Sequence, residues 1–443
     1  MDGSGLKKEI GVFGAMSIIG GIVIGSGVFY VGSFVIERAG FSIGIATAAW
    51  IFAGCYALMA GLCYAELGAA MPEAGGAYVY LKRTYGPLVA FMMGWTDFWI
   101  SCSASISALA LGFATYLSVF VPLSAMGVKL AAVALIVLLS VVNMLGVKNS
   151  GRLQSLLMVM KLVPIFVIIV FGLSHLGGGA ANPVTFEAAG DRSFFSTFAL
   201  AVMAALWAYD GWSSVTLVTE EIKDPEKNLP KAMFLAIGGV TIIYTLFNFV
   251  LMKLLPLSEM AADPNPGSSV SVLLFGKVGA AFITVAILIS ILGATNGSIL
   301  AFPRETYAMA RDKRFFAVFA TIHPKFHTPV VAQFAMMIVS IAVIFIGSFE
   351  QITVLVVFTQ TIFYTMAILA LFILRKRCPD MKRPYKVLGY PVLPGLTLLW
   401  ATWLLVNSLI EDPSGSVMGL IVPVTGIPLY FYFNKKYGDN GAK

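Results

Sequence analysis

The sequence predicts an all-α integral membrane protein, on the evidence of its composition, its long apolar runs and the placement of its basic residues. Of 443 residues, 59% are hydrophobic and 12% are charged, and the mean hydropathy is +0.89. A soluble domain carries about 25% charged residues. The apolar runs are long enough to cross a hydrocarbon core roughly 30 Å thick. Because backbone groups in lipid must hydrogen-bond internally, these runs are predicted to be helices.

Twelve spans are predicted between charged or Pro/Gly-rich breaks. They cover residues 10–36, 42–69, 87–118, 127–146, 153–176, 194–218, 229–255, 270–301, 329–348, 351–374, 393–410 and 415–433. With a cytoplasmic N-terminus, 23 of the 29 Lys and Arg residues fall on the cytoplasmic side, five fall outside and Lys161 lies within a span. Cytoplasmic loops collect Lys and Arg, so both termini are expected in the cytoplasm. The net charge of +7 is therefore a topology signal, and no nucleic-acid partner is expected.

The cysteines and histidines predict neither a disulfide framework nor a metal site. Three of the four cysteines fall within predicted spans, and the three histidines are scattered without ligand spacing. No nucleophile or metal cluster lies beside a base, so the chain is not expected to be an enzyme or to hold a cofactor.

The first and sixth predicted spans are each interrupted near their middle. In the first, Gly25, Ser26 and Gly27 lie in "GGIVIGSGVFY", and glycine is the residue that most readily bares its backbone. In the sixth, "LWAYDGWSSV" places Asp210 and Gly211 within an apolar run. Each interruption falls about 16 residues into its span, so both are expected at mid-membrane.

Five spans separate the starts of the two interrupted helices, so they are expected to cross the membrane in opposite directions. Paired breaks in inverted halves indicate a transporter with its substrate at the repeat interface. Residues 1–176 are predicted to form the first five-helix repeat and residues 177–374 the inverted second repeat. Residues 375–443 would add helices 11 and 12 and the cytoplasmic C-terminus.

Broken helices suit a zwitterionic ligand. Freed N–H groups at a half-helix start attract a carboxylate, and freed carbonyls at a half-helix end attract an ammonium. Two alternatives stand beside this reading. Gly21 and Gly25 form a G-x-x-x-G pair that can serve helix packing alone, and Asp210 can be a structural hydrogen-bonded carboxylate.

Several motifs resemble those of the amino acid–polyamine–organocation superfamily, most closely its L-amino acid transporter family in the bacterial form. The motifs are "IGSGVF" at 24–29, "MPEAGGAYVYLKRTYGPLVAFMMGW" at 71–95, "WAYDGW" at 207–212, "VTEEIKDPEKNLPKAM" at 218–233 and "ATNGSILAFPRETYAMARD" at 294–312. The resemblance covers most of the first ten spans. It implies the 5+5 inverted-repeat, leucine-transporter-like fold with helices 1 and 6 discontinuous. It also implies sodium-independent amino acid transport, in many members by exchange.

The resemblance also implies a set of substrate-binding residues. The substrate carboxylate is expected at Ser26, Gly27 and nearby amides, and the ammonium at carbonyls around Val23 and Ile24 and around Trp207 and Asp210. Trp207 resembles the aromatic residue that closes over the substrate from outside, and Tyr244 resembles a cavity-lining residue. The expected set is Val23, Ile24, Gly25, Ser26, Gly27, Trp207, Tyr209, Asp210 and Tyr244.

The chain departs from the mammalian members in one loop. Those members bond a heavy subunit through a cysteine between spans three and four, and here that loop, "VFVPLSAMG" at 119–127, has none. A bacterial cytoplasmic-membrane transporter without a disulfide-linked heavy subunit is therefore expected, with the substrate and the lipid bilayer as its partners.

Lys161 lies about 14 Å along its helix from Arg152, where a charge costs about 2.5–3.5 kcal/mol on insertion scales. Snorkelling toward the cytoplasm is the structural alternative to a functional role. The resemblance places this lysine where sodium sits in sodium-coupled relatives, bound to the first broken helix. A neutral lysine would instead carry a coupling proton.

Three further polar residues are candidates for the cavity. Asp97 is expected to pair with Lys161, to bind a proton or to serve packing. Asn296 and Ser298 are expected either to face Lys161 across the first helix or to serve packing between helices.

The resulting prediction is a sodium-independent exchanger of neutral L-amino acids working by alternating access. Proton-coupled uptake of neutral or cationic amino acids and polyamine uptake stay open as alternatives. Asp210 leaves room for a second substrate ammonium. The cytoplasmic loops, at about 30 residues or fewer, are too short for the output domain of a receptor, and few deep charges are present to line a channel.

Overall fold

The computed structural model describes residues 6–176, 180, 182–189, 193–346, 349–411 and 413–438. These residues form a helical bundle without strands, and a single isolated bridge pairs Ile10 with Ile222. The predicted helical class is therefore confirmed.

Within the described chain, seven helical runs are long and apolar enough to span a membrane, and a bent helix pair makes an eighth. The runs are α3 (Ile43–Ala70), Pro87–Leu117, α7 (Ala125–Met144), α8 (Val147–Ser174), Phe194–Glu221, α10 (Pro225–Leu254) and Lys277–Arg311. The bent pair is α1 (Val12–Val23) and α2 (Gly27–Arg38). The last four predicted spans coincide with α15 (Val330–Ile346), α16 (Phe349–Arg377), α17 (Val392–Glu411) and the pair α18 (Pro413–Thr425) and α19 (Ile427–Phe433).

Three of the long runs are composite. Pro87–Leu117 joins α5 (Pro87–Thr96), the π-helix η1 (Asp97–Ser101) and α6 (Cys102–Leu117). Phe194–Glu221 joins α9 (Phe194–Ala208) to the 3₁₀ helix η2 (Trp212–Glu221), and Lys277–Arg311 joins α13 (Lys277–Ala301) to α14 (Pro303–Arg311).

One predicted boundary is wrong. The eighth span was expected to start at residue 270, but residues 266–275 form a separate short helix, α12 (Pro266–Phe275), and α13 starts at Lys277. Gly276, with φ of +63°, ends α12 in a conformation that side-chain-bearing residues rarely adopt. Hydropathy alone does not detect such a turn, because the helices on both sides of it are apolar.

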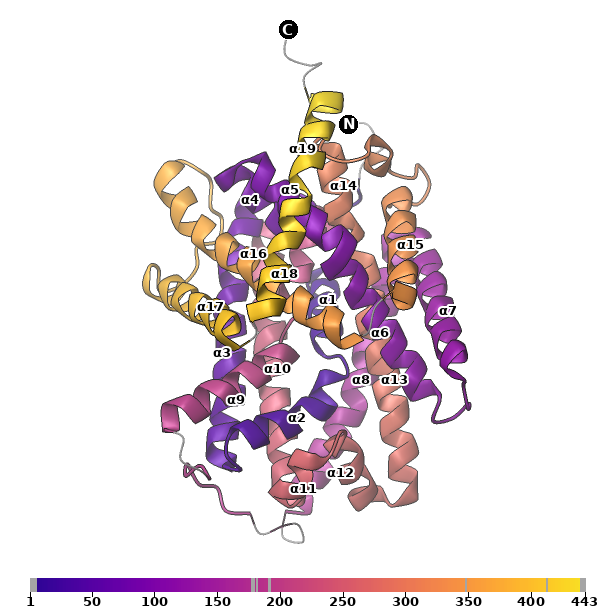
Figure 1. Ribbon diagram of the computed structural model, residues 1–443, viewed down its shortest axis with the longest axis vertical. Coiled ribbons are helices and arrows are strands. Elements are labelled where there is room, and N and C mark those ends of the chain that lie inside the picture. The colour runs from indigo at the N-terminus through magenta and orange to yellow at the C-terminus, as the bar shows by residue number, and fades with distance from the viewer. Residues whose placement is uncertain are drawn as a thin grey trace.

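Short helices lie at the two ends of the bundle. Figure 1 shows α4 (Ala77–Tyr85), α14 and α19 at one end, and α11 (Leu257–Ala262) and α12 at the opposite end. The remaining short elements are η3 (Ala317–Ala320) and η4 (Asn434–Gly438).

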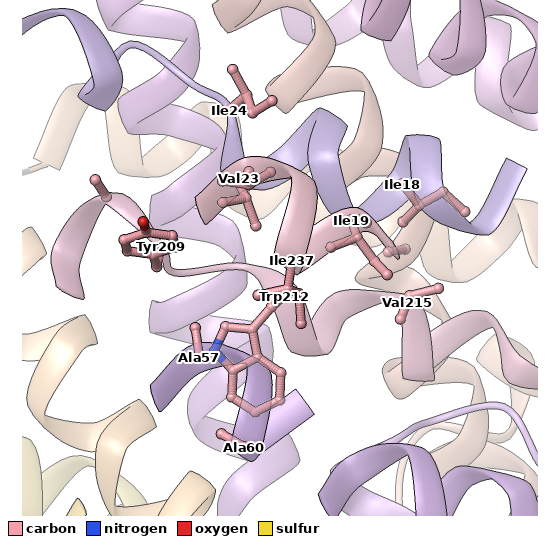
Figure 2. Close-up of a cluster of buried hydrophobic side chains, with 14 of the residues drawn as sticks. Ile18, Ile19, Val23, Ile24, Ala57, Ala60, Tyr209, Trp212, Val215 and Ile237 are labelled. Carbon is pink, nitrogen blue, oxygen red and sulfur yellow. The ribbon is translucent and has the colours of Figure 1, made fainter. Parts of the chain in front are cut away.

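The two interrupted helices lie at the centre of the buried core. Figure 2 shows Ile19 and Val23 of α1 beside Trp212 and Val215 of η2, with Ala60 of α3 below the indole ring. All of these side chains are buried. Small residues on α3 leave space for the indole, so the second broken helix is held between α1 and α3.

Candidate functional site

The first span is broken where the sequence predicts. Helix α1 ends at Val23, α2 begins at Gly27, and the two axes differ by 52°. A Cβ on Gly25 would meet nothing closer than 3.8 Å, whereas one on Gly21 would lie 1.8 Å from the amide nitrogen of Gln154. The packing alternative therefore applies to Gly21, which lets α8 approach, and Gly25 belongs to the break.

The sixth span is broken at the predicted residues as well. Helix α9 ends at Ala208, and Gly211 adopts φ of +99° before η2 begins as a 3₁₀ helix. A Cβ on Gly211 would lie 2.5 Å from Cγ2 of Ile22, so glycine is required there both by conformation and by space.

The two broken helices run antiparallel to each other. Helix α1 packs against η2, and α2 packs against α9. The start of α1 is fixed to the end of η2 because the Ile10 N–H donates to the Glu221 carbonyl at 3.0 Å and the Lys223 N–H donates to the Ile10 carbonyl at 2.8 Å. The opposed orientation expected from the sequence is therefore present.

The start of α2 presents free backbone donors. Within the described chain, the N–H groups of Ser26, Gly27 and Val28 have no backbone hydrogen-bond partner. They lie at the positive end of the α2 dipole, which favours an anion. A Cβ on Gly27 would lie 3.3 Å from the Trp207 ring, so the second broken helix packs directly beside these donors.

The carbonyls released by the first break are largely occupied. Lys161 is fully buried, and its Nζ donates to the carbonyls of Gly21 at 2.8 Å, Ile24 at 2.6 Å and Ser290 at 3.0 Å. The Ser290 hydroxyl also donates to Ile24 at 2.9 Å, and the Tyr244 hydroxyl donates to Val23 at 2.8 Å. This geometry excludes snorkelling of Lys161. It also departs from the expectation that the Val23 and Ile24 carbonyls are free for a substrate ammonium.

A cavity of about 390 Å³ lies between the two breaks. Most of the expected binding residues line it, together with two of the three further candidates. The expected residues at its wall are Val23, Gly25, Ser26, Gly27, Trp207, Asp210, Asp97 and Ser298.

Four of the expected residues, Ile24, Tyr209, Tyr244 and Asn296, lie behind the cavity wall. Tyr209 is buried, and its hydroxyl donates to the Trp50 carbonyl at 3.0 Å. The Asn296 amide donates to Gln154 at 2.7 Å. These residues do not form the cavity surface, and the hydroxyl and amide groups among them bond to neighbouring helices. The prediction placed them at the cavity because the sequence alone could not assign each turn of a broken helix to a face.

Trp207 lies in the last turn of α9, and Asp210 lies in the second break itself. The Trp207 ring lies 5.7 Å from the Tyr30 ring, so the two aromatic residues cover the first turn of α2 together. The Asp210 side chain is exposed to the cavity, and its nearest hydroxyl, that of Tyr364, lies at 3.5 Å.

Asp97 does not pair with Lys161, whose Nζ is surrounded by carbonyls. Instead Asp97 lies beside Glu305, and a carboxyl oxygen of each lies within 4.8 Å of the other and of the Cys102 sulfur. Glu305 was not predicted from the sequence, although it belongs to the motif at 294–312 and lies two residues after Pro303. Ser290 was not predicted either, because the sequence carries no distinguishing signal for it.

Two opposed helix breaks enclosing a cavity define the class of membrane transporters that bind substrate at mid-membrane between discontinuous helices. The sequence matches the amino acid permease family over residues 10–431. The chain therefore belongs to the amino acid permease family.

Curated relatives align with nearly the whole chain. The serine/threonine exchanger SteT of Bacillus subtilis (strain 168) is 35% identical over 436 residues, covering 98% of each chain. The cystine/glutamate transporter of Homo sapiens is 30% identical, covering 97% of this chain and 85% of the relative. The large neutral amino acids transporter small subunit 2 of Homo sapiens is 33% identical, covering 97% and 81%.

Proposed function

We propose that the chain is a sodium-independent exchanger of L-amino acids, with small or medium neutral amino acids among its substrates. It would reside in a bacterial cytoplasmic membrane with twelve spans, two inverted five-helix repeats and both termini in the cytoplasm. The observation that carries this proposal is the pair of antiparallel helix breaks on one cavity. The names of the relatives, an exchanger and two amino acid transporters, support it.

The break residues suit the amino-acid head group. The free N–H groups at Ser26, Gly27 and Val28 suit the substrate carboxylate. Ile22 lines the cavity, and within the described residues its carbonyl accepts no hydrogen bond, so it suits the substrate ammonium together with the Asp210 carboxylate. Trp207 would close over the head group beside Tyr30.

Lys161 supports sodium independence. Carbonyl oxygens can replace the hydration shell of an alkali cation. Here the carbonyl oxygens of Gly21 and Ile24 at the first break and of Ser290 in α13 surround the Lys161 ammonium. A covalently held cation occupies this position permanently, so no transported sodium ion is needed to hold the first break against α13.

Transport into proteoliposomes tests the proposal. Uptake of labelled L-amino acids is expected only when the vesicles contain unlabelled amino acid, and it should be the same with and without sodium. A proton gradient that drives uptake into empty vesicles would contradict exchange and would establish the proton-coupled alternative. Failure of every amino acid in the panel to exchange would overturn the proposal.

A further inference from the structure

The cavity wall is acidic. Asp97, Asp210 and Glu305 line it, and none of its described lining residues is Lys, Arg or His. Two buried basic side chains are bound elsewhere: Arg304 forms an ion pair with Glu221 at 2.8 Å, and the Lys161 ammonium donates to three carbonyls. The negative charge of this wall therefore has no counter-charge from a lining side chain.

Two helix irregularities bring Asp97 and Glu305 together. Asp97 begins the π-helix η1, and Glu305 lies in the first turn of α14, just after the Pro303 break. A Cβ on Gly94 would lie 2.2 Å from the sulfur of Met309. The bare backbone of α5 thus lets α14 approach closely, one turn away from both carboxyl groups.

Two buried polar atoms of the cavity wall have no hydrogen-bond partner in the described chain. Glu305 is 2% exposed, and its Oε1 has no hydrogen-bond partner in the described chain. Ser298 is 1% exposed and lines the same cavity, and its hydroxyl also has no partner there. Buried polar groups are normally paired, so these two atoms need a partner from outside the chain, such as a ligand, an ion or a water molecule.

Two buried carboxyl groups this close can both be ionised only if a cation lies beside them. Without a cation, they share a proton. We infer that the Asp97–Glu305 pair is a subsite for the side-chain cation of an amino acid substrate, namely a primary ammonium at the end of an alkyl chain. The inference rests on the proposed exchange of amino acids. The broken helices hold the common head group, and the pair receives the second ammonium in place of a shared proton.

The subsite is complementary to an ammonium in its donor and acceptor count. An ammonium offers three donors and no acceptor, and the pair offers only acceptors once both carboxyls are ionised. An alkyl linker suits the remaining wall, which includes Ala104, Leu109 and Phe302. A neutral amino acid of equal length fills the linker space and leaves the pair without its cation.

Exchange assays with matched ligands test the subsite. Proteoliposomes loaded with unlabelled serine receive labelled lysine, ornithine or 2,4-diaminobutyrate, and norleucine or norvaline serve as neutral controls of similar length. At least one diamino acid should exchange tenfold faster than its neutral counterpart at subsaturating concentration. Exchange of neutral amino acids with exclusion of every diamino acid would overturn the inference and leave the proposed function standing. Loss of all exchange would overturn the proposed function.

Amide variants locate the effect. Asp97→Asn and Glu305→Gln should each lower the ratio of diamino to neutral exchange at least tenfold, and Glu73→Gln should leave the ratio as in the wild type. Glu73 is the matched control because its carboxylate is about half exposed and lies outside the cavity wall. Equal ratios in all variants, or diamino exchange that needs added Zn²⁺ and disappears with a chelator, would overturn the assignment. The ligand series on the wild type decides the matter if a variant does not fold.

Discussion

Lys161 replaces several hydrogen bonds that the first break removes. A helix end leaves backbone carbonyls without intrahelical donors, and here one buried ammonium satisfies the carbonyls of Gly21, Ile24 and Ser290. The charged head is anchored to both α1 and α13. Its function is therefore expected to be mechanical as well as electrostatic, since it couples the broken helix to its neighbour.

Replacing Lys161 by alanine should reduce transport at least tenfold while leaving folding and membrane insertion intact. The substitution leaves the Gly21 carbonyl without a donor and the Ile24 carbonyl with the Ser290 hydroxyl alone. An unpaired buried group costs about 1–3 kcal/mol, and the ammonium link between α1 and α13 is lost. Exchange in proteoliposomes measures the activity, and size-exclusion chromatography in detergent measures folding. Arg152→Ala, at the exposed end of the same helix, is the control and should retain wild-type exchange. Normal exchange by Lys161→Ala would contradict the coupling role.

The Tyr244 hydroxyl gives a finer test of the same backbone. It donates to the Val23 carbonyl at 2.8 Å and lies behind the cavity wall. Tyr244→Phe removes a single hydrogen bond and should raise the KM for the substrate about three- to tenfold, in line with about 0.5–1.5 kcal/mol for such a bond. Labelled-substrate exchange at varied concentration measures this change. A fall in maximal rate at unchanged KM would show that the bond serves motion and not head-group positioning.

Individual residues were predicted from the sequence to different degrees. Lys161 was found because a charge deep in an apolar run is costly, and this cost is visible without a structure. The second donor to the Ile24 carbonyl was not predictable, because it is Ser290, a serine with no unusual sequence context. Glu305 was missed because a carboxylate near a span end looks like an ordinary interfacial charge.

At the scale of the helix, Ser26 and the three carboxylates of the cavity each lie at a local irregularity. Ser26 and Asp210 lie at the two breaks, Asp97 lies in a π-helix and Glu305 follows a proline break. Irregular backbone at membrane depth is tolerated where protein buries it or where it lines a cavity. The glycine-bearing breaks were predicted because glycine and aspartate interrupt apolar runs. The π-helix was not, because "GWTDFW" contains no helix-breaking residue apart from Gly94.

Gly211→Ala tests the second break. At φ of +99° an alanine is strained, and its Cβ would lie 2.5 Å from Ile22, so α1 and η2 must separate. We expect exchange to fall more than tenfold and the protein to lose about 2 kcal/mol or more of stability. Gly238→Ala in α10 is the matched control, because nothing lies within 4 Å of the new Cβ and helical alanine is favoured over glycine. Thermal unfolding in detergent and exchange assays measure both variants, and equal behaviour of the two would contradict a required bend.

At the scale of the molecule, the bundle is joined at one end by a buried ion pair. Arg304 of α14 and Glu221 of η2 are fully buried, and the backbone of Glu221 also accepts the N–H of Ile10. Glu221 thus connects the start of the first broken helix, the end of the second broken helix and the helix that carries Glu305. The sequence showed both charges but not their pairing, because 83 residues separate them.

Breaking this pair should destabilise the whole bundle. Glu221→Gln leaves the Arg304 guanidinium buried without a counter-charge, and such a loss costs about 3–5 kcal/mol. The double variant Glu221→Leu/Arg304→Met removes both charges and should recover most of that stability, because two apolar side chains need no counter-ion. Glu73→Gln, in the partly exposed pair with Arg311, should cost less than about 1 kcal/mol. Midpoints of thermal unfolding in detergent rank the four proteins. A double variant as unstable as Glu221→Gln would show that shape, and not charge pairing, holds this end of the bundle together.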